Sequence, residues 1–277
     1  MSYSAEISRA NPTCLLFLLD ESMSMSDQLP DGRTKADEVA LILNRTLQDL
    51  IIRCGREDGV RDYFDVGVIG YHNETTRNAL PGPLNQEILH PLSQVDANPL
   101  RVEDRMRTMP DGIGGLIEVP VKFPTWYVAF NSGGTPMCAA LTKAAEELAT
   151  WSDAHPSSFP PVVLHLTDGD PTDGDPEPIA EALAEIGTDD GSVILMNIHI
   201  SPVSNHAVIF PDDANVLSDD AASRLFRMSS FLPPSMAEEA KARGYQISTD
   251  SRAFVFNAKS EEIIQFFQIG TRPSTLR

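Results

Sequence analysis

The sequence predicts an α/β fold whose central sheet is doubly wound, mostly parallel and flanked by helices. Short, almost wholly apolar runs alternate along the chain with longer segments of helical periodicity. Such runs are typical of parallel strands buried on both faces, and the alternation is typical of the helices that connect them. One long stretch, residues 72–131, breaks the alternation and predicts an irregular insertion after the second strand.

Two strands and one long helix are expected before the insertion. The run TCLLFLL (Thr13–Leu19) predicts a strand with both faces buried. In Lys35–Arg53 the apolar residues recur at helical spacing, which predicts an amphipathic helix. The run YFDVGVIGY (Tyr63–Tyr71) predicts the second strand, and its glycines would let a neighbouring segment approach closely.

The insertion itself is rich in Pro, Gly and Asn and has no helical period. A stretch of about 60 residues without a clear helix is long for a connection inside a compact domain. Short β-like pieces such as LIEVPVKF (Leu116–Phe123) predict a hairpin. We therefore expect an addition at one edge of the sheet.

The alternation of strands and helices resumes after the insertion. It predicts a single domain over residues 12–268, with flanking tails at 1–11 and 269–277. The expected strands are Pro161–Thr167, Ser192–Ile200 and Arg252–Phe256, and the expected helices are Pro136–Trp151, Glu177–Ile186, Ala221–Phe231, Ser235–Arg243 and Ser260–Gln268.

Composition limits the classes of partner and the compartment. The formal net charge of −19 argues against nucleic acid and against anionic membranes, because both bind clustered Lys and Arg. The apolar run Cys14–Leu19 is too short to span a bilayer, and the first dozen residues lack the layout of a signal peptide. Three cysteines without a disulfide or zinc spacing predict a cytoplasmic protein.

Oxygen-bearing side chains follow the expected strands at three places. Asp20, Ser22 and Ser24 leave the first strand at alternate positions, Thr135 follows a Gly-Gly pair before a helix, and Asp168 follows a buried strand. Because ligands of doubly wound sheets gather at the carboxyl ends of the strands, we expect these five residues to meet. Two carboxylates and three hydroxyls suit a hard cation, most of all Mg²⁺, although Mn²⁺ and Ca²⁺ accept the same ligands. As single residues, each could instead cap a helix or form an Asx turn.

Together these residues resemble a known site. Asp20-Glu21-Ser22-Met23-Ser24 matches the D-x-S-x-S motif of von Willebrand factor A (VWA) domains. Thr135 and Asp168 stand in the loops where that family carries the remaining ligands of its metal-ion-dependent adhesion site (MIDAS). The resemblance covers about residues 12–268 and implies a Rossmann-like VWA fold. Met23 stands where many relatives have Gly, and the 72–131 insertion replaces a short connection.

Within VWA domains the chain is most similar to bacterial cytoplasmic proteins of the tellurium-resistance-associated (TerY-like) group. The similar segments are LLDESMSM, FDVGVIGY, SGGTPMCAAL and LTDGDPTDGDP. The resemblance implies a non-enzymatic adaptor or scaffold in a multi-protein stress-response or defence-type system. Such a module captures a partner's Asp or Glu carboxylate on the metal, and its partners are often encoded nearby as protein kinases, PP2C-type phosphatases or ATPases. The alternative is a metal-dependent phosphoester hydrolase that uses the same acidic site.

Several other polar residues near these loops have simpler interpretations. Asp27 could belong to a second cation site or could be a solvated residue before the helix. The acids Asp170, Asp173 and Asp175 lack the closing Glu of an EF-hand loop, which favours a solvated acidic loop. No histidine forms a metal-binding pair, and Cys138 has no base beside it, so we expect neither zinc nor a thiol nucleophile.

Overall fold

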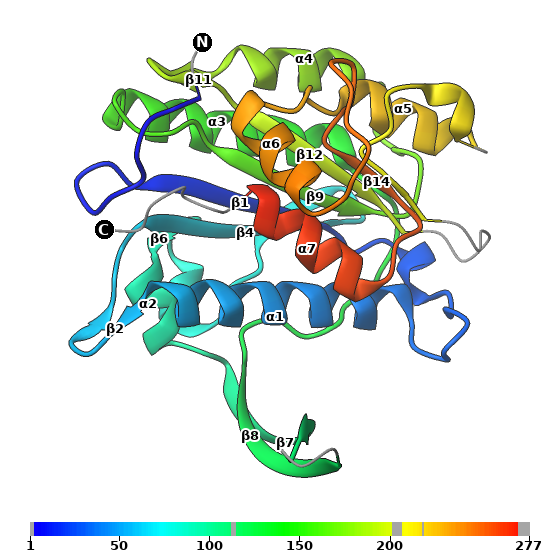
Figure 1. Ribbon diagram of the computed structural model, residues 1–277. Helices are drawn as coiled ribbons and strands as arrows, with labels where there is room; N and C mark the ends of the chain where they lie inside the picture. Colours follow the sequence, from blue (N-terminus) through cyan, green and yellow to red (C-terminus); the bar gives the residue numbers. More distant parts are fainter. Residues whose placement is uncertain (1–2, 112–114, 201–206, 218, 271–277) are drawn as a thin grey trace.

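A central sheet lies between two layers of helices in the computed structural model, which describes residues 3–111, 115–200, 207–217 and 219–270 (Figure 1). In the described part of the chain this sheet has eight strands in the order β13-β14-β12-β9-β1-β4-β5, with β6 also paired to β4. The expectation of an α/β fold with a mostly parallel central sheet and flanking helices is therefore confirmed.

Five parallel strands form the middle of the sheet. They are β1 (Thr13–Asp20), β4 (Phe64–His72), β9 (Val162–Thr167), β12 (Ile194–His199) and β14 (Phe254–Phe256). Strand β1 pairs with β4 on one side and with β9 on the other. The chain thus adds strands first to one side of β1 and then to the other, which places the topological switch point of the sheet at β1.

Antiparallel strands complete both edges. Strand β13 (Val208–Ile209) pairs with β14, while β5 (Thr75–Asn78) and β6 (Leu89–Pro91) both pair with β4. Because β5 and β6 belong to residues 72–131, this part of the insertion lies at the sheet edge, as expected. The insertion also contains the short helix α2 (Leu92–Ala97), for which the sequence showed no period.

The two helical layers follow from the alternation of side chains along the strands. Leu15, Phe17 and Leu19 of β1 point to one face, and Leu16 and Leu18 point to the other. The first face is covered by α1 (Lys35–Cys54), α2, α6 (Pro234–Ala242) and α7 (Ser260–Gly270), and the second by α3 (Met137–Ala154), α4 (Glu177–Glu185) and α5 (Asp220–Met228).

Short elements fill the connections. Two small hairpins pair β2 (Gly55–Arg56) with β3 (Gly59–Val60) and β10 (Gly187–Thr188) with β11 (Gly191–Ser192). Single 3₁₀ turns are η1 (Met23–Ser26), η2 (Gly82–Asn85) and η3 (Ala214–Val216).

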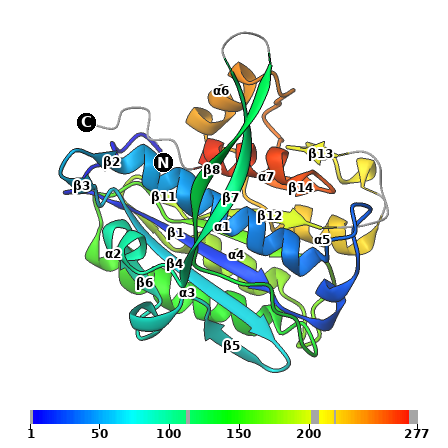
Figure 2. The ribbon, with the colours of Figure 1, turned by 90° about the horizontal axis from the view of Figure 1, so that it is seen from below.

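A hairpin arm projects from the layer of α1 (Figures 1 and 2). It consists of β7 (Arg101–Pro110) and β8 (Leu116–Thr125), which pair along their full length. Near its base, Phe123 is buried, and the Gln48 side chain of α1 donates a hydrogen bond to the Lys122 carbonyl. The rest of the arm extends away from the sheet, so the hairpin predicted from LIEVPVKF exists but is not part of the central sheet.

The two ends of the chain differ from the expected tails. Backbone N–H groups of Ser4 and Ala5 donate to the carboxylate of Asp190, and Ile7 is buried in the core. Residues 3–7 are therefore held against the domain. The expected tail 269–277 begins inside α7, and its residues 271–277 lie outside the described residues. Within the described residues, no helix combines the length and the apolar composition that a membrane crossing requires.

Candidate functional site

Two acids meet at the switch point of the sheet. Asp20 is the last residue of β1, and Asp168 follows directly after β9, the parallel neighbour of β1. Both positions are at carboxyl ends of strands, where open α/β sheets bind their ligands. The order of the strands therefore brings together two carboxylates that are far apart in the sequence.

The loop after β1 turns sharply around the Asp20 carboxylate. One oxygen, Oδ1, accepts a hydrogen bond from the backbone N–H of Ser22 at 2.8 Å. The other, Oδ2, accepts one from the hydroxyl of Thr167 at 2.6 Å. This Asx turn and the following 3₁₀ turn η1 return the chain toward the strand ends. The side chain of Asp20 is only 1% exposed and is held in one position.

Hydroxyl groups connect this loop to the second acid. The Oγ atoms of Ser22 and Ser24 lie 3.0 Å apart, and Ser24 Oγ donates to Asp168 Oδ1 at 2.8 Å. Four of the five predicted site residues, Asp20, Ser22, Ser24 and Asp168, are thus linked by direct polar contacts. This arrangement explains the alternate spacing of Ser22 and Ser24, since both side chains face the same centre.

The loop that leads to Thr135 is joined to the Asp20 loop by backbone contacts. The N–H of Met23 donates to the Gly133 carbonyl at 2.9 Å, and the N–H of Ser132 donates to the Glu21 carbonyl at 2.7 Å. Gly133 has φ +63°, and a Cβ there would collide with Asn73, so only glycine fits this approach. In the part of the chain that the structure describes, no hydrogen bond joins the Thr135 hydroxyl to the other four residues.

A lysine that the sequence did not suggest belongs to the same cluster. Lys35 Nζ lies 2.6 Å from Asp168 Oδ2 and 3.0 Å from Asp27 Oδ2. Burial lowers the pKa of Lys35, but the carboxylates of Asp168 and Asp27 outweigh this and raise it above its ordinary value. Lys35 shares a helical face with the buried Val39, which directs its side chain toward the interior.

The net charge of the two buried carboxylates and Lys35 is negative. Burial raises the pKa of Asp20 to about 6; hydrogen bonds from Ser22 and Thr167 lower it in part, and the charge of Asp168 raises it further. Asp20 and Asp168 are both buried carboxylates, and Lys35 is paired with only the second of them. Since buried charges are normally compensated, this imbalance favours the binding of an additional cation.

The donor set decides which cation the residues fit. Carboxylate and hydroxyl oxygens converge here, and these are the ligands of Mg²⁺, Mn²⁺ and Ca²⁺ rather than of zinc or copper. Among the described residues, no group of three or more His, Cys, Asp and Glu side chains is placed to hold a metal ion. The site instead combines two acids with hydroxyls, and these residues fit a hard divalent cation that retains some of its water.

Glu21, between Asp20 and Ser22, points away from this centre into a separate buried network. Its carboxylate accepts hydrogen bonds from Arg77 Nε at 2.8 Å and from the Tyr127 hydroxyl at 3.0 Å, and it lies 3.1 Å from His72 Nδ1. Gly70 leaves room for this, because a Cβ there would lie 2.4 Å from Glu21 Oε1. The network ties the loop of Asp20 to the inserted segment that contains Tyr127.

The acidic loop after Asp168 makes polar contacts with the helices around it. Asp173 accepts hydrogen bonds from the backbone N–H groups of Cys138 and Ala139, at the start of α3. Asp170 pairs with Arg224, and Asp175 accepts the N–H of Glu177 at the start of α4. These three acids thus make protein contacts, and, contrary to the expectation, the loop is not wholly solvated.

Cysteine and histidine chemistry is not supported at this site. Burial and the nearby Asp173 carboxylate raise the pKa of Cys138 to about 11, so its thiol stays protonated, and the residue is half-buried. His165 is fully buried between the Tyr71 hydroxyl and the Asn197 side chain. His199 is also buried in its strand.

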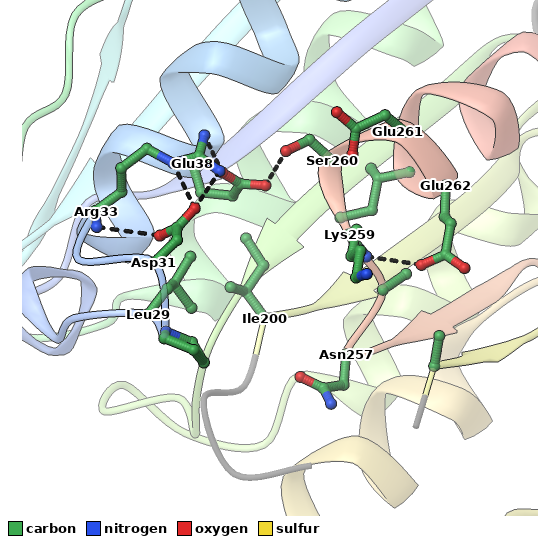
Figure 3. A pocket seen from close by; sticks show the side chains of 14 residues that line it. Leu29, Asp31, Arg33, Glu38, Ile200, Asn257, Lys259, Ser260, Glu261 and Glu262 are labelled. Carbon is green, nitrogen blue, oxygen red and sulfur yellow. Dashed lines mark hydrogen bonds and ion pairs between the residues drawn. The ribbon is translucent and has the colours of Figure 1, made fainter. Parts of the chain in front are cut away.

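A pocket of about 550 Å³ lies between the segment before α1 and the start of α7 (Figure 3). Three of its charged residues, Asp31, Arg33 and Glu38, are paired with one another. Arg33 Nη1 lies 2.7 Å from Glu38 Oε2, Arg33 also binds Asp31, and the Ser260 hydroxyl donates to Glu38. The pocket therefore contains a polar contact that joins α1 to α7, and none of the five predicted site residues lines it.

Comparisons with known proteins add little. No family model and no curated protein matches this chain. Among solved structures it is similar to the three N-terminal domains of the type V pili tip protein Mfa5 from Porphyromonas gingivalis, with 11% identity and a TM-score of 0.33. The likeness covers 57% of this chain and 20% of the pilus protein's chain. A TM-score this low does not establish a common fold.

Proposed function

We propose that this chain is a VWA-type, TerY-like interaction module that depends on a divalent cation. It acts as an adaptor or scaffold in a bacterial multi-protein stress-response or defence-type system in the cytoplasm. It captures an Asp or Glu carboxylate of a partner protein, such as a kinase, a PP2C-type phosphatase or an ATPase. Asp20, Ser22, Ser24, Thr135 and Asp168 hold the cation, with Mg²⁺ preferred over Mn²⁺ and Ca²⁺.

One observation carries this proposal. Two buried carboxylates, Asp20 and Asp168, are linked through the Ser22 loop and the Ser24 hydroxyl at the switch point of the sheet, and among the described residues Lys35 is the one cation paired with them. Capping residues do not need this arrangement, because a cap uses a single oxygen at a helix end. A cation site does need it, since several oxygens must face one point.

The residues of the chain have separate tasks in this proposal. Asp20 and Asp168 supply negative charge, and their positions are fixed by Thr167 and Lys35 respectively. Ser22 and Ser24 direct their hydroxyl oxygens to the same centre, and the Thr135 hydroxyl would be a further ligand. A bound Mg²⁺ would supply the positive charge to which a partner's carboxylate binds. No bond of the partner is made or broken.

The direct test is calorimetric titration of Mg²⁺ into protein freed of metal with EDTA. We expect saturable binding and a rise in melting temperature, because an ion that binds only the folded state stabilises it. Asp168→Asn keeps the size of the side chain, removes its charge and should abolish both effects. Asp96→Asn, on an exposed face of α2, removes the same charge far from the site and should change neither.

Two results would contradict the proposal. The first is Mg²⁺ binding that is equal in the wild type and in Asp168→Asn. The second is Mg²⁺-dependent turnover of a phosphomonoester by the purified wild-type protein that is lost in Asp168→Asn. The second result would establish the alternative function, a metal-dependent phosphoester hydrolase.

A further inference from the structure

The ammonium group of Lys35 is surrounded by oxygens as a metal ion would be. Its Nζ lies 2.6 Å from Asp168 Oδ2, 3.0 Å from Asp27 Oδ2 and 3.5 Å from the Ser24 carbonyl. Two of these oxygens are carboxylate oxygens and one is a backbone carbonyl, which is a combination found around Ca²⁺. The side chain of Lys35 is only 5% exposed, so this ammonium is a fixed part of the protein interior.

The Lys35 ammonium lies next to the proposed metal ligands, at a position that differs from the one proposed for the metal ion. Asp168 directs Oδ2 to Lys35 and Oδ1 to Ser24 Oγ, so its two oxygens face two different centres. The second centre also contains Asp27, whose side chain is 60% exposed. The single carboxylate of Asp168 therefore lies between two neighbouring cation positions.

We propose that Lys35 occupies a second cation position and thereby limits the site to one metal ion. The inference rests on the proposed function, and it assigns to Lys35 a role in the stoichiometry and charge of that site. A divalent ion at this position would have to displace a buried ammonium that makes charge-assisted hydrogen bonds to two carboxylates. Bonds of this kind are among the stronger ones in proteins, and so the displacement is unfavourable.

This arrangement also affects recognition of a partner. Lys35 balances the charge of Asp168 through Oδ2 and leaves Oδ1 of the same carboxylate facing the proposed metal site. A divalent ion bound beside Asp20 then leaves the buried site with an excess of positive charge. An incoming Asp or Glu side chain requires this excess of positive charge, because electrostatic attraction must offset the free energy lost when its carboxylate leaves water.

The test is the number of ions bound by variants at residue 35. Lys35→Ala removes the ammonium and leaves an empty position lined by the carboxylates of Asp168 and Asp27. We expect the wild type to bind one Ca²⁺ or Mn²⁺ by calorimetry and Lys35→Ala to bind two. Two Mn²⁺ ions that share Asp168 should also broaden the Mn²⁺ electron paramagnetic resonance signal through their coupling.

Two matched variants separate occupancy of the position from a general effect of charge. Lys35→Met removes the same charge but keeps most of the side-chain volume, so it should still bind one ion. Lys35→Ala combined with Asp27→Asn removes a carboxylate of the second position and should also bind one ion. Asp27 is exposed, and its substitution should not disturb the fold.

The outcomes distinguish this inference from the proposed function. A wild type that binds no ion contradicts the proposed function. A wild type that binds one ion and a Lys35→Ala variant that also binds only one contradict the role of Lys35 alone. If Lys35→Ala unfolds without metal, millimolar Ca²⁺ should restore its folding by replacing the ammonium. A variant that stays unfolded in Ca²⁺ would overturn the inference.

Discussion

At the scale of single residues, two consecutive carboxylates have opposite tasks. Asp20 ends a buried strand and accepts hydrogen bonds from the Ser22 N–H and the Thr167 hydroxyl, whereas Glu21 turns to the other side and binds Arg77 and Tyr127. The reversal follows from strand geometry, in which successive side chains point to opposite faces. The cation site and the contact that anchors its loop therefore come from adjacent residues.

His165 provides a prediction about acid stability at this scale. Its Nε2 lies 2.7 Å from the Tyr71 hydroxyl and its Nδ1 2.7 Å from Asn197 Oδ1. The amide oxygen can only accept, so Nδ1 carries the proton and the neutral ring accepts from Tyr71. Burial lowers the pKa of His165 from 6.5 to about 4, and the hydrogen bond to Asn197 opposes this only in part.

The sign of the effect follows from proton binding. Between pH 6.5 and about pH 4 the unfolded chain binds a proton at His165 and the folded protein does not, so acidification destabilises the fold. Near pH 4.5 this contribution amounts to about 2–3 kcal/mol. His165→Gln cannot titrate, and its free energy of unfolding should fall less steeply between pH 7 and 4.5 than that of the wild type.

Urea unfolding at several pH values measures this slope. Asp20, whose pKa is raised, contributes with the opposite sign: the folded protein binds its proton first, which stabilises the fold as the pH falls through about 6. This contribution is shared by the wild type and His165→Gln and cancels in their comparison. Equal slopes in the two proteins would show that His165 is not held neutral.

At the scale of elements, the long apolar and periodic segments could be predicted and the short ones could not. Strand β1 and helix α1 have nearly the expected ends, because burial on both faces or on one face leaves a clear pattern. Strands β5 and β6 are short, and their place is set by pairing with β4. Such pairing is a tertiary contact that local sequence does not encode.

The candidate site could likewise be predicted from the sequence only in part. Asp20, Ser22, Ser24 and Asp168 could be grouped from sequence because each follows an expected strand or lies in the turn after it. Lys35 could not be placed there, since a lysine at the first position of a helix is normally solvated. Its inward position depends on the direction in which α1 leaves the loop. That direction is set by the Thr34–Asp37 capping box, in which each side chain binds the backbone N–H of the other.

The β7–β8 arm leads to the prediction that the rest of the domain folds without it. The described contacts of the arm with the body are concentrated near its base, at Phe123 and at the Gln48–Lys122 hydrogen bond. Arg101 and Thr125 are paired neighbours, so residues 103–123 can be replaced by a short Asn-Gly turn. We expect a loss of stability of about 2–4 kcal/mol, mainly from Phe123.

Thermal unfolding and Mg²⁺ calorimetry of the shortened protein measure the two expected results. The Mg²⁺ affinity should equal that of the full chain, because no residue of the arm contacts Asp20, Ser22, Ser24 or Asp168 in the described structure. Phe123→Ala in the intact chain is the matched control and should reproduce most of the loss. A shortened protein that unfolds or fails to bind Mg²⁺ would show that the arm is an integral part of the domain.

At the scale of the whole molecule, the net charge of −19 affects the stability of the protein in every cation-binding assay. Self-repulsion of a strongly charged chain destabilises its compact state. Raising the ionic strength from about 0.01 M to about 0.1 M shortens the screening length from about 30 Å to about 10 Å. Sodium chloride should therefore raise the melting temperature of the wild type even though it does not bind the site.

Comparison of salts at equal ionic strength separates this screening from binding at the switch point. Sodium chloride should stabilise the wild type and Asp168→Asn by similar amounts, since one charge in nineteen changes the repulsion little. Magnesium chloride at the same ionic strength should stabilise the wild type further and Asp168→Asn no more than sodium chloride does. Differential scanning calorimetry measures all four shifts. If magnesium exceeds sodium equally in both proteins, the ion binds diffusely to the acidic surface, and the carboxylates at the ends of β1 and β9 are not its site.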